Sequence, residues 1–438
     1  MKFSLSTSFA RLAFVTLLAV FLLAAGGRLV SLNVSGAACP TWPVCLPLAA
    51  GAWAQMFHRV SAGLSAVLVL ALLFEAWRTQ RDHRYLLPLT TVSVVLFFAQ
   101  AFVGALQVTR GFPLYLMVLH SLTALALWVA LLGLVVTAGF YAKDTVAYPP
   151  LDVRQRLRDF LTLTKPIIVL LLLVTTFAGM VAGGKAWPSL SLGIWTLVGG
   201  ALAAGGSGAV NQYIDRDLDK NMQRTARRPM AAGRMTPAEG LSFGLALCIA
   251  SFYIMAGYVN LLAAFLSLAG IFYYVLLYSV WLKKATVQNI VIGGGAGAIP
   301  PLVGWAAATG RIDIPAMILF LIVFMWTPPH FWALAIVRRK DYEHAGVPML
   351  PVIRGERETR KQVLIYTIEL VAVTFLLPLF KYTGMVYLVS AAVLGILLLY
   401  FAWKVYRTEG NKVAWTMYRF SSMYLMFLFL ALMVDALV

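Results

Sequence analysis

The sequence predicts an all-α integral membrane protein, in which a four-helix transmembrane bundle precedes a bundle of nine transmembrane helices. Two observations lead to this prediction. Of the 438 residues, 61% are hydrophobic and 12% are charged, and a soluble domain would carry about twice that charged fraction. The apolar residues also form runs of about 20, the length that a helix needs to cross the hydrocarbon core. Such runs fit helices, because a spanning helix satisfies its own backbone hydrogen bonds.

Thirteen segments are apolar and long enough to be membrane spans. The first resembles a signal peptide in composition, but its apolar run continues past the small residues as far as Val30, and further spans follow. We therefore interpret it as an uncleaved span. The predicted spans cover residues 11–31, 60–77, 86–108, 115–141, 166–184, 190–210, 241–258, 260–281, 288–308, 314–337, 363–382, 384–404 and 416–437.

The most polar linker in the first half of the chain separates the fourth and fifth predicted spans. It covers residues 143–165 and contains a Pro-Pro pair and the charged stretch Arg154–Asp159. This composition is typical of a domain boundary followed by a short amphipathic helix on the membrane surface. We therefore divide the chain into a four-span domain at residues 1–142, the linker, and a nine-span domain at residues 166–438.

Basic residues concentrate in alternate loops. The net charge of +18 suggests nucleic acid at first sight, but bases in short loops between apolar segments act as topology signals, so we expect no nucleic-acid binding. With the N-terminus in the cytoplasm, six basic loops all fall on the cytoplasmic side. The sequence thus predicts a multi-pass protein of the cell (inner) membrane. The six loops are 78–84, 143–165, 216–234, 283–284, 338–361 and 404–412.

A polar stripe follows the sixth predicted span. Asn211, Asp215 and Asp219 are four residues apart, so on a helix their side chains share one face. Carboxylate and amide oxygens can hold Mg²⁺, which commonly uses a few carboxylates, waters and substrate phosphates. Arg224 and Arg228, in the basic run that comes next, can hold phosphate oxygens. The alternative is a solvated loop whose basic charges only set the topology.

Two further polar patches fall on the same predicted side of the membrane. Tyr278 and Lys283 belong to the first patch and could add a hydroxyl and an ammonium to a phosphate site. Asp341 belongs to the second and could supply another metal ligand, directly or through water. A polar pocket that opens to the cytoplasm between apolar helices suits a lipid diphosphate, because its head needs metal and its tail needs the membrane.

The nine-span domain resembles the intramembrane prenyltransferases of the UbiA superfamily, whose first aspartate-rich motif matches Asn211-x3-Asp215-x3-Asp219. Other segments resemble the protohaem IX farnesyltransferases, or haem O synthases, within that superfamily, and the resemblance covers about residues 155–437. Ser279 stands where this family usually has Thr, and Lys340 stands where an aspartate often precedes Asp341. The matching segments are Arg224-Thr225 with Arg228-Pro229, Leu282–Thr286, Asn289–Gly294, Ala298–Trp305, Trp326–Ile336 and Asp341–Pro351.

The resemblance implies a reaction and a set of residues for it. The farnesyl group of farnesyl diphosphate would pass to the 2-vinyl group of haem B, with addition of water, giving haem O and diphosphate. Asn211, Asp215, Asp219 and Asp341 would hold Mg²⁺. The implied catalytic residues are Asp215, Asp219, Lys283 and Tyr278, and the implied diphosphate-binding residues are Asn211, Arg224, Arg228 and Lys283.

Four residues are candidate contacts to the haem substrate: His330, Trp332, Asp341 and Tyr342. For His330, the alternative is a hydrogen-bonded histidine beside the Pro328-Pro329 pair. For the aromatic residues, including Trp326, the alternative is a place at the membrane–water interface, which we expect for at least one of them.

The four-span domain contains two histidines, His58 and His120, that the predicted topology places near the same, extracytoplasmic face. Two histidines that face each other across a membrane four-helix bundle are candidate haem ligands. The alternative is that each is a packed, hydrogen-bonded residue.

This domain resembles one half of haem A synthase over about residues 8–140. The matching segments are Cys39–Cys45, Phe57–Arg59, Gln100–Val108 and Leu119-His120. The resemblance implies that Cys39 and Cys45 form a disulfide or a redox pair, outside the cytoplasm where disulfides are allowed. The family has a glutamate where this chain has Gln55, so we assign no haem A synthase activity.

The sequence therefore predicts a haem O synthase whose N-terminal domain binds haem, with haem A synthase or cytochrome oxidase assembly proteins as expected partners. One alternative is a UbiA-type prenyltransferase that acts on a quinone precursor or chlorophyllide. Another is a haem-binding or haem-transfer membrane protein whose prenyltransferase half is inactive. A secondary transporter is disfavoured, because the polar residues gather at one face and not at mid-membrane.

Overall fold

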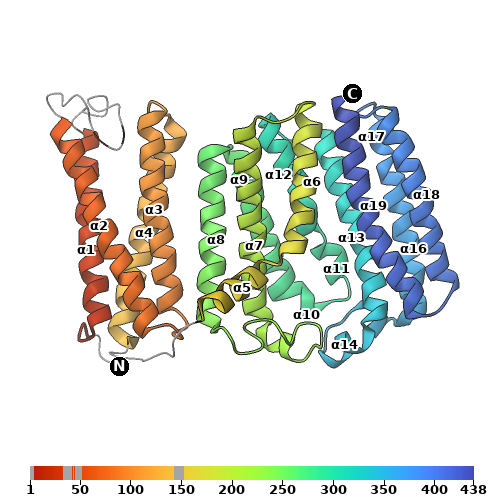
Figure 1. Cartoon of the computed structure of the whole chain (residues 1–438), viewed down its shortest axis with the longest axis horizontal. Helices are drawn as coiled ribbons and strands as arrows, with labels where there is room; N and C mark the ends of the chain where they lie inside the picture. The colour runs from red at the N-terminus through yellow and green to blue at the C-terminus, as the bar shows by residue number, and fades with distance from the viewer. Residues whose placement is uncertain (1–3, 33–41, 43, 45–51, 143–151) are drawn as a thin grey trace. The chain divides into compact units, whose positions relative to one another are not determined.

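Helices form all the regular secondary structure in the part of the chain that the computed structural model describes, residues 4–32, 42, 44, 52–142 and 152–438 (Figure 1). Among these described residues, thirteen helical stretches are long and apolar enough to cross a membrane. This number confirms the span count that hydropathy predicts, and the chain is a multi-pass membrane protein.

Four helices make up most of the first compact unit, which comprises Met1–Phe160 and Met235–Tyr253. Helix α1 packs against α2 and α4, and α3 packs against the same two helices, so the four form a bundle. Helix α2 begins well before the predicted residue 60, and His58 therefore lies inside it. The four are α1 (Ser8–Leu32), α2 (Ala52–Thr79), α3 (Leu86–Thr109) and α4 (Leu114–Tyr141).

The first unit also takes in most of α8 (Pro237–Tyr258), which chain order places in the predicted nine-span domain. The buried Glu239 carboxylate pairs with Arg156 at 3.1 Å and with Arg81 at 3.8 Å. Because these ion pairs tie α8 to the first unit, the compact units do not follow the predicted boundaries at residues 142 and 165.

Helix α5 (Val153–Thr164) is the helix predicted after the linker. Val153, Leu157 and Leu161 are exposed at four-residue spacing, and Asp159 and Leu163 are buried on another face. The helix is therefore amphipathic, as the sequence predicts, and it leads directly to the first helix of the second unit.

The second compact unit comprises Leu161–Arg234 and Ile254–Val438. It contains long spanning helices and several short ones that turn the chain at their ends. They are α6 (Pro166–Gly184), α7 (Leu190–Lys220), α9 (Leu261–Phe272), the π-helix η2 (Tyr273–Leu282), α10 (Lys283–Ala285), α11 (Asn289–Gly293), α12 (Gly295–Thr309), α13 (Ile314–Val337), α14 (Arg339–His344), α15 (Leu350–Ile353), α16 (Gly355–Thr374), α17 (Leu376–Leu379), α18 (Met385–Arg407) and α19 (Asn411–Leu437).

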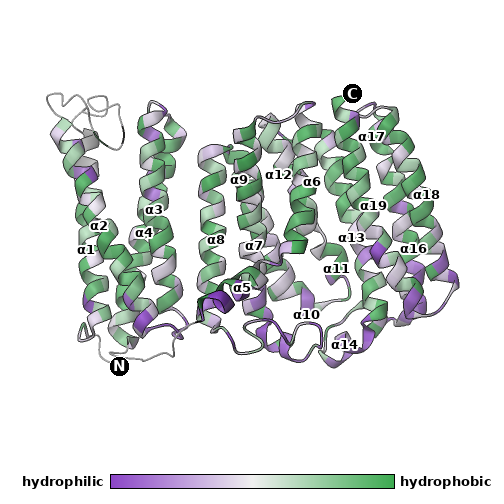
Figure 2. Ribbon diagram, viewed as in Figure 1, coloured by the Kyte–Doolittle hydropathy of each residue, from purple (hydrophilic) through white to green (hydrophobic). Residues whose placement is uncertain are grey.

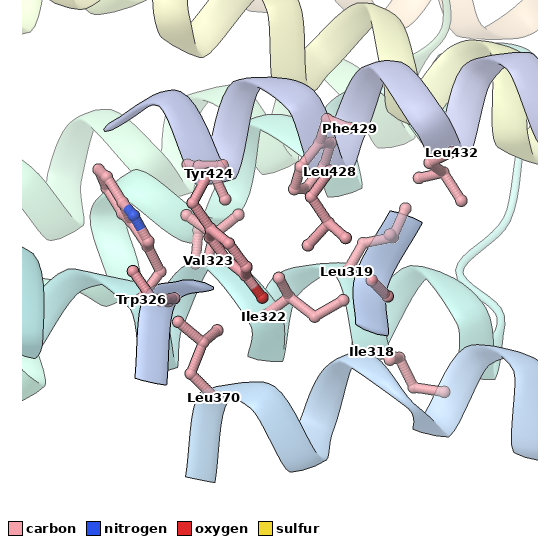
Figure 3. Packing of buried hydrophobic residues seen from close by; sticks show 14 of the residues in the cluster. Ile318, Leu319, Ile322, Val323, Trp326, Leu370, Tyr424, Leu428, Phe429 and Leu432 are labelled. Carbon is pink, nitrogen blue, oxygen red and sulfur yellow. The ribbon is translucent and has the colours of Figure 1, made fainter. Parts of the chain in front are cut away.

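The core of the second unit lies around α13, which packs against α12, α16 and α19. Apolar side chains of α13 and α19, including Val323 and Leu428, meet in this core (Figure 3). The Trp326 indole N–H donates a hydrogen bond of 2.8 Å to the Ser421 carbonyl. Between lipid-embedded helices, close packing and such hydrogen bonds hold the bundle together. The core thereby fixes α13 and the short α14 that follows it.

Hydrophilic residues of the second unit gather at one end, around α10, α14 and the chain that follows α7 (Figure 2). The three polar patches of the sequence contribute to this end. The functional site is built here.

Candidate active site

The Asn211, Asp215 and Asp219 side chains lie on one buried face of α7. The sequence predicts that the span ends near residue 210, but α7 continues to Lys220, so the stripe is helical. All three residues are buried, whereas Asp217 is exposed and pairs with Lys220 at 3.0 Å. A solvated loop, the alternative interpretation of this stretch, is therefore wrong.

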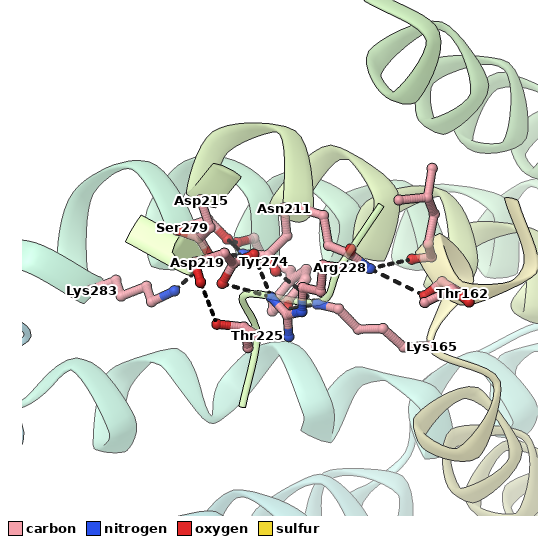
Figure 4. A network of polar contacts seen from close by, with 12 residues as sticks. Thr162, Lys165, Asn211, Asp215, Asp219, Thr225, Arg228, Tyr274, Ser279 and Lys283 are labelled. Atoms are coloured by element: carbon pink, nitrogen blue, oxygen red, sulfur yellow. Dashed lines mark hydrogen bonds and ion pairs between the residues drawn. The ribbon is translucent and has the colours of Figure 1, made fainter. Parts of the chain in front are cut away.

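Each oxygen-bearing side chain of the stripe contacts a cation from another segment (Figure 4). Lys283 Nζ lies 2.5 Å from Asp215 Oδ2. Arg228 Nη1 donates to both oxygens of Asp219, at 2.7 and 2.9 Å. The third cation, Lys165, donates to Asn211 Oδ1 at 2.7 Å. The structure thus brings five predicted site residues into one network: Asn211, Asp215, Asp219, Arg228 and Lys283. It adds Lys165, which the sequence does not predict as a site residue.

The Asn211 amide is oriented by its neighbours. Its Nδ2 donates to Asp215 Oδ2 at 2.8 Å and to Ser279 Oγ at 2.9 Å, so its oxygen points to Lys165. Ser279 donates in turn to the Tyr274 carbonyl at 2.8 Å. The hydroxyl that the related family usually supplies from Thr is therefore present here as Ser.

Lys165 occupies the joint between α5 and α6, directly before Pro166. Its backbone has φ of 55°, a left-handed conformation that is uncommon for residues other than glycine. Its Nζ also lies 3.1 Å from the Tyr274 hydroxyl. Burial, reinforced by the Arg228 guanidinium, lowers the pKa of Lys165 to about 7, and the nearby aspartates oppose that shift. The sequence signal for it is a lysine directly before the proline that begins an apolar span.

The π-helix η2 places two tyrosines beside the stripe. A π-helix is wider than an α-helix and is frequent at functional sites. The Tyr274 and Tyr278 rings are stacked, with centroids 5.7 Å apart. The Tyr278 ring also lies against the backbone of Gly293, where a β-carbon would clash with it. Tyr278 lies close enough to Asp215 to interact with it electrostatically, so the first two predicted patches meet.

The third predicted patch reaches the same site through Tyr342 in α14. Tyr342 is buried and packs in a cluster with Met222, from the chain after α7, and Ile290. Burial raises the pKa of Tyr342, and the Arg224 guanidinium opposes that shift. Arg224 itself is exposed. All three patches therefore converge at one end of the second unit.

Asp341 is placed differently from the other predicted metal ligands. Its Oδ2 is buried, lies 3.9 Å from Arg338 and makes no hydrogen bond within the described residues. Across those same residues, the structure forms no group of three or more His, Cys, Asp or Glu side chains suited to a metal ion. The metal role of Asp341 stays a prediction.

His330 is packed in an aromatic environment. Its Nδ1 lies 2.6 Å from Ser421 Oγ, and its ring stacks on Trp326 and Tyr418, with centroid distances of 4.2 and 4.5 Å. This geometry agrees with a hydrogen-bonded histidine, and its contact to haem stays a prediction. Trp332 is buried edge-on against Tyr366.

The membrane–water interface was the alternative location for the aromatic residues of the third patch. The structure buries Trp326, Trp332 and Tyr342 within the protein, whereas Phe331 of the same patch is exposed. Burial argues against lipid contact for Trp326, Trp332 and Tyr342, and their level relative to the membrane–water interface stays a prediction.

His58 and His120 form a second candidate site, within the first unit. The two rings lie near enough to interact electrostatically. Each ring also lies on a glycine of a neighbouring helix: a β-carbon on Gly27 would come 2.8 Å from His58, and one on Gly104 would come 3.1 Å from His120. The predicted Cys39–Cys45 pair lies outside the described residues.

The nitrogen atoms of these two rings differ in their partners. Both Nδ1 atoms are buried without a hydrogen-bond partner in the described part of the chain. His120 Nε2 lies 3.0 Å from Gln100 Nε2. Gln55, where the related family has glutamate, is buried in α2.

Comparison with protein families matches residues 172–431 to the UbiA prenyltransferase family. The chain belongs to this family. The match confirms the prenyltransferase resemblance of the second half of the chain. Residues 47–226 match the cytochrome oxidase assembly protein family, which supports the separate resemblance of the N-terminal part. The two matches overlap, so they do not mark a domain boundary.

Curated relatives of this chain are named protohaem IX farnesyltransferase. One from Roseiflexus castenholzii is 42% identical over 98% of this chain and 84% of its own length. One from Symbiobacterium thermophilum is 50% identical over 64% of this chain and 95% of its own length. A solved structure of digeranylgeranylglyceryl phosphate synthase aligns with a TM-score of 0.56 at 18% identity, over 65% of this chain and 99% of that chain. This last likeness confirms the predicted UbiA-type helical fold.

Proposed function

We propose that this UbiA-family prenyltransferase is a protohaem IX farnesyltransferase, or haem O synthase. It transfers the farnesyl group of farnesyl diphosphate to the 2-vinyl group of haem B, with addition of water, and releases diphosphate. The observation that carries this proposal is the buried Asn211, Asp215 and Asp219 stripe faced by cations, in a chain 42% identical to a relative of that name over 98% of its length.

The stripe fits Mg²⁺. Two carboxylates and an amide oxygen are the hard oxygen ligands that this ion prefers, and Asp215 Oδ1 is buried without a hydrogen-bond partner within the described residues. When bound, Mg²⁺ would neutralise charge on the diphosphate. Asn211, Asp215 and Asp219 would hold the ion, and Asp341 is a proposed further ligand.

The cations of the site stabilise the leaving group. When the allylic C–O bond of farnesyl diphosphate breaks, the electron pair leaves with the diphosphate, and positive charge remains on the farnesyl chain. Fixed cations help most where charge develops. We assign this role to Lys283, Arg228 and the exposed Arg224.

The remaining steps need positioning and control of water. The π-electrons of the haem vinyl group attack the allylic cation, and the new cation takes up water and loses a proton, which gives the hydroxyethylfarnesyl side chain. The rings of Tyr274 and Tyr278 are stacked, and aromatic faces can stabilise a nearby cation. Tyr278 is the residue we assign to this role.

The haem substrate needs contacts beyond the stripe. We assign Tyr342 first, because it interacts with both Tyr278 and Arg224. His330, Trp332 and Asp341 are the other proposed contacts. His330 would act from a fixed ring, since Ser421 and two aromatic rings hold it.

The polar end of the second unit supports a proposal for the location of the protein. We assign the protein to the cell (inner) membrane, with its N-terminus and the active site on the cytoplasmic side, because the basic loops alternate and the site residues lie at the hydrophilic end (Figure 2). Haem A synthase or cytochrome oxidase assembly proteins are the partners we propose, since the next step of haem modification would consume haem O.

Haem binding by the N-terminal domain, residues 1–142, is a second function that a specific observation favours. His58 and His120 present imidazoles whose buried Nδ1 atoms lack hydrogen-bond partners in the described residues, and each ring packs closely on a glycine of a neighbouring helix. When bound, a haem would give this domain redox chemistry. The prenyltransferase domain at 166–438 and the linker at 143–165 would not take part.

Product analysis tests the proposed reaction. The purified full-length protein is incubated with haem B, farnesyl diphosphate and Mg²⁺, and the haems are extracted for mass spectrometry. We expect haem O, at the mass of haem B plus a farnesyl group and a hydroxyl group, and no product when Mg²⁺ is chelated. Unchanged haem B, from protein shown to be folded, would contradict the proposal and favour a quinone precursor or chlorophyllide as the acceptor.

A further inference from the structure

The three cations that face the α7 stripe have different partners. Lys283 and Arg228 each pair with a carboxylate. Lys165 contacts an amide oxygen and a phenol oxygen instead, and within the described residues it forms no ion pair. A buried charge without a counter-ion is costly. Lys165 is therefore the cation of this site whose surroundings most need an anion.

The position of Lys165 is set by the chain on both sides of it. The Gln212 side chain donates to the carbonyls of Thr162 and Leu163, at 3.2 and 3.1 Å, which ties this segment to α7 one residue after Asn211. Lys165 then adopts a left-handed backbone before Pro166. A strained conformation persists only where the surrounding structure holds it, so the ammonium is directed into the site by its surroundings.

We propose that Lys165 is a third diphosphate-binding cation, which holds the Asn211 oxygen in the ligand-free chain and contacts the diphosphate when Mg²⁺ takes that oxygen. This inference rests on the proposed function. An ammonium 2.7 Å from the amide oxygen occupies the space that the metal ion would need. Like charges at such a distance repel strongly. Lys165 must therefore leave Asn211 when the metal binds, and the diphosphate is the anion that receives it.

The same exchange applies to all three pairs of the stripe. Mg²⁺ alone would displace three cations that have no anion to accept them. Pyrophosphate alone would draw the cations away and leave two buried carboxylates uncompensated. Metal and diphosphate together satisfy both sets of charges. We therefore expect each to strengthen binding of the other by about tenfold or more, within the range of ordinary coupling between ligands.

Binding of inorganic pyrophosphate tests the role of Lys165 without turnover. Calorimetry on the purified full-length protein measures the affinity for magnesium pyrophosphate and for pyrophosphate in a chelator. Lys165→Met keeps the apolar stem and removes the ammonium, and we expect it to weaken magnesium pyrophosphate binding about ten- to hundredfold, as loss of a charge-assisted hydrogen bond does. Mg²⁺ alone should then bind as well or better, because the Asn211 oxygen is no longer covered.

Lys185 supplies the matched control. It is an exposed lysine that also has a left-handed backbone, with φ of 48°, at the opposite end of α6. Lys185→Met should leave pyrophosphate affinity within about twofold of wild type. Lys165→Gly is the second variant, because glycine adopts the left-handed conformation freely. It keeps the test available if Lys165→Met does not fold.

The outcomes separate this inference from the function on which it rests. If Lys165→Met or Lys165→Gly binds magnesium pyrophosphate as wild type does, while Arg228→Gln binds it weakly, the role of Lys165 is overturned and the diphosphate site stands. If Asp215→Asn and Arg228→Gln also bind it normally, the diphosphate site itself is overturned. Weaker binding in both Lys165 variants, with Lys185→Met unchanged, supports the inference.

Discussion

The two candidate sites are built on opposite principles. At the α7 stripe, every oxygen-bearing side chain is matched by a cation, so the site is charged and internally compensated. At the histidine pair, the groups are imidazoles, and the Nδ1 atoms lack partners among the described residues. A compensated site can bind a ligand only by exchanging ions, whereas ring nitrogens without partners can accept a ligand without displacing an ion pair. The first arrangement suits a metal and an anion bound together, and the second suits a planar group held by ring nitrogens.

The largest expected effect comes from the carboxylates of the stripe. Asp215→Ala and Asp219→Ala should each lower haem O formation by about a thousandfold, because each removes a metal ligand and leaves a cation unpaired. Mass spectrometry of extracted haems measures this. The control is Asp217→Ala, which changes an exposed aspartate on another face of the same helix and should retain activity. Substantial turnover in either site variant would remove the metal–diphosphate account.

The next effect belongs to the other site. His58→Ala or His120→Ala should abolish a low-spin haem absorption spectrum in the purified protein, because each removes one proposed axial ligand. His83→Ala is the control, since His83 lies between α2 and α3 and accepts hydrogen bonds from the backbone N–H groups of Tyr85 and Leu86. If wild-type protein shows no haem spectrum after loading with haem B, the ligand assignment is wrong.

A smaller loss is expected from Lys283, which contributes charge but no metal ligand. Lys283→Met should slow farnesyl transfer about a hundredfold, since one fixed cation is lost from the leaving group. The neighbouring Lys284 is exposed, so Lys284→Met should stay within about twofold of wild type. Equal losses in both variants would indicate that the loop needs only net positive charge, as a topology signal does.

The smallest effect on catalysis is expected from the ion pairs of Glu239. Glu239→Gln leaves Arg81 and Arg156 without their shared carboxylate and should destabilise the protein by about 2 kcal/mol, below the loss seen when a fully buried pair is broken. Thermal unfolding in detergent measures the change, with the exposed Glu343→Gln as control. Farnesyl transfer at 25 °C should persist. Loss of activity in stable protein would connect this cluster to the active site.

Hydropathy predicted the spans well because crossing a bilayer imposes a minimum apolar length that the sequence displays directly. It failed at the end of α7. The drop in hydropathy after residue 210 indicated the end of a span, but Asn211, Asp215 and Asp219 are polar because they are buried in a site and not because the helix has ended. The same four-residue spacing that predicted the stripe would have predicted the longer helix.

Contacts between distant segments could not be read from the sequence. Lys165 lies 46 residues before Asn211. In the sequence it is one more basic residue of a linker whose basic residues indicate membrane topology. Ser279 lies 68 residues after Asn211, whose amide donates a hydrogen bond to its hydroxyl. Only the resemblance to the related family indicated a hydroxyl at position 279. The place of α8 in the first unit depends on Glu239, a lone acidic residue at a helix start whose partners lie on other elements.

The independence of the two sites is tested most directly by measuring both properties in the same two variants. One preparation carries Asp215→Ala and the other carries His58→Ala with His120→Ala, and each is assayed for its haem spectrum and for haem O formation. We predict that the first keeps the spectrum and makes no haem O, and that the second makes haem O and lacks the spectrum. Loss of both properties in either variant, in protein shown to be folded, would contradict the account of two separate sites.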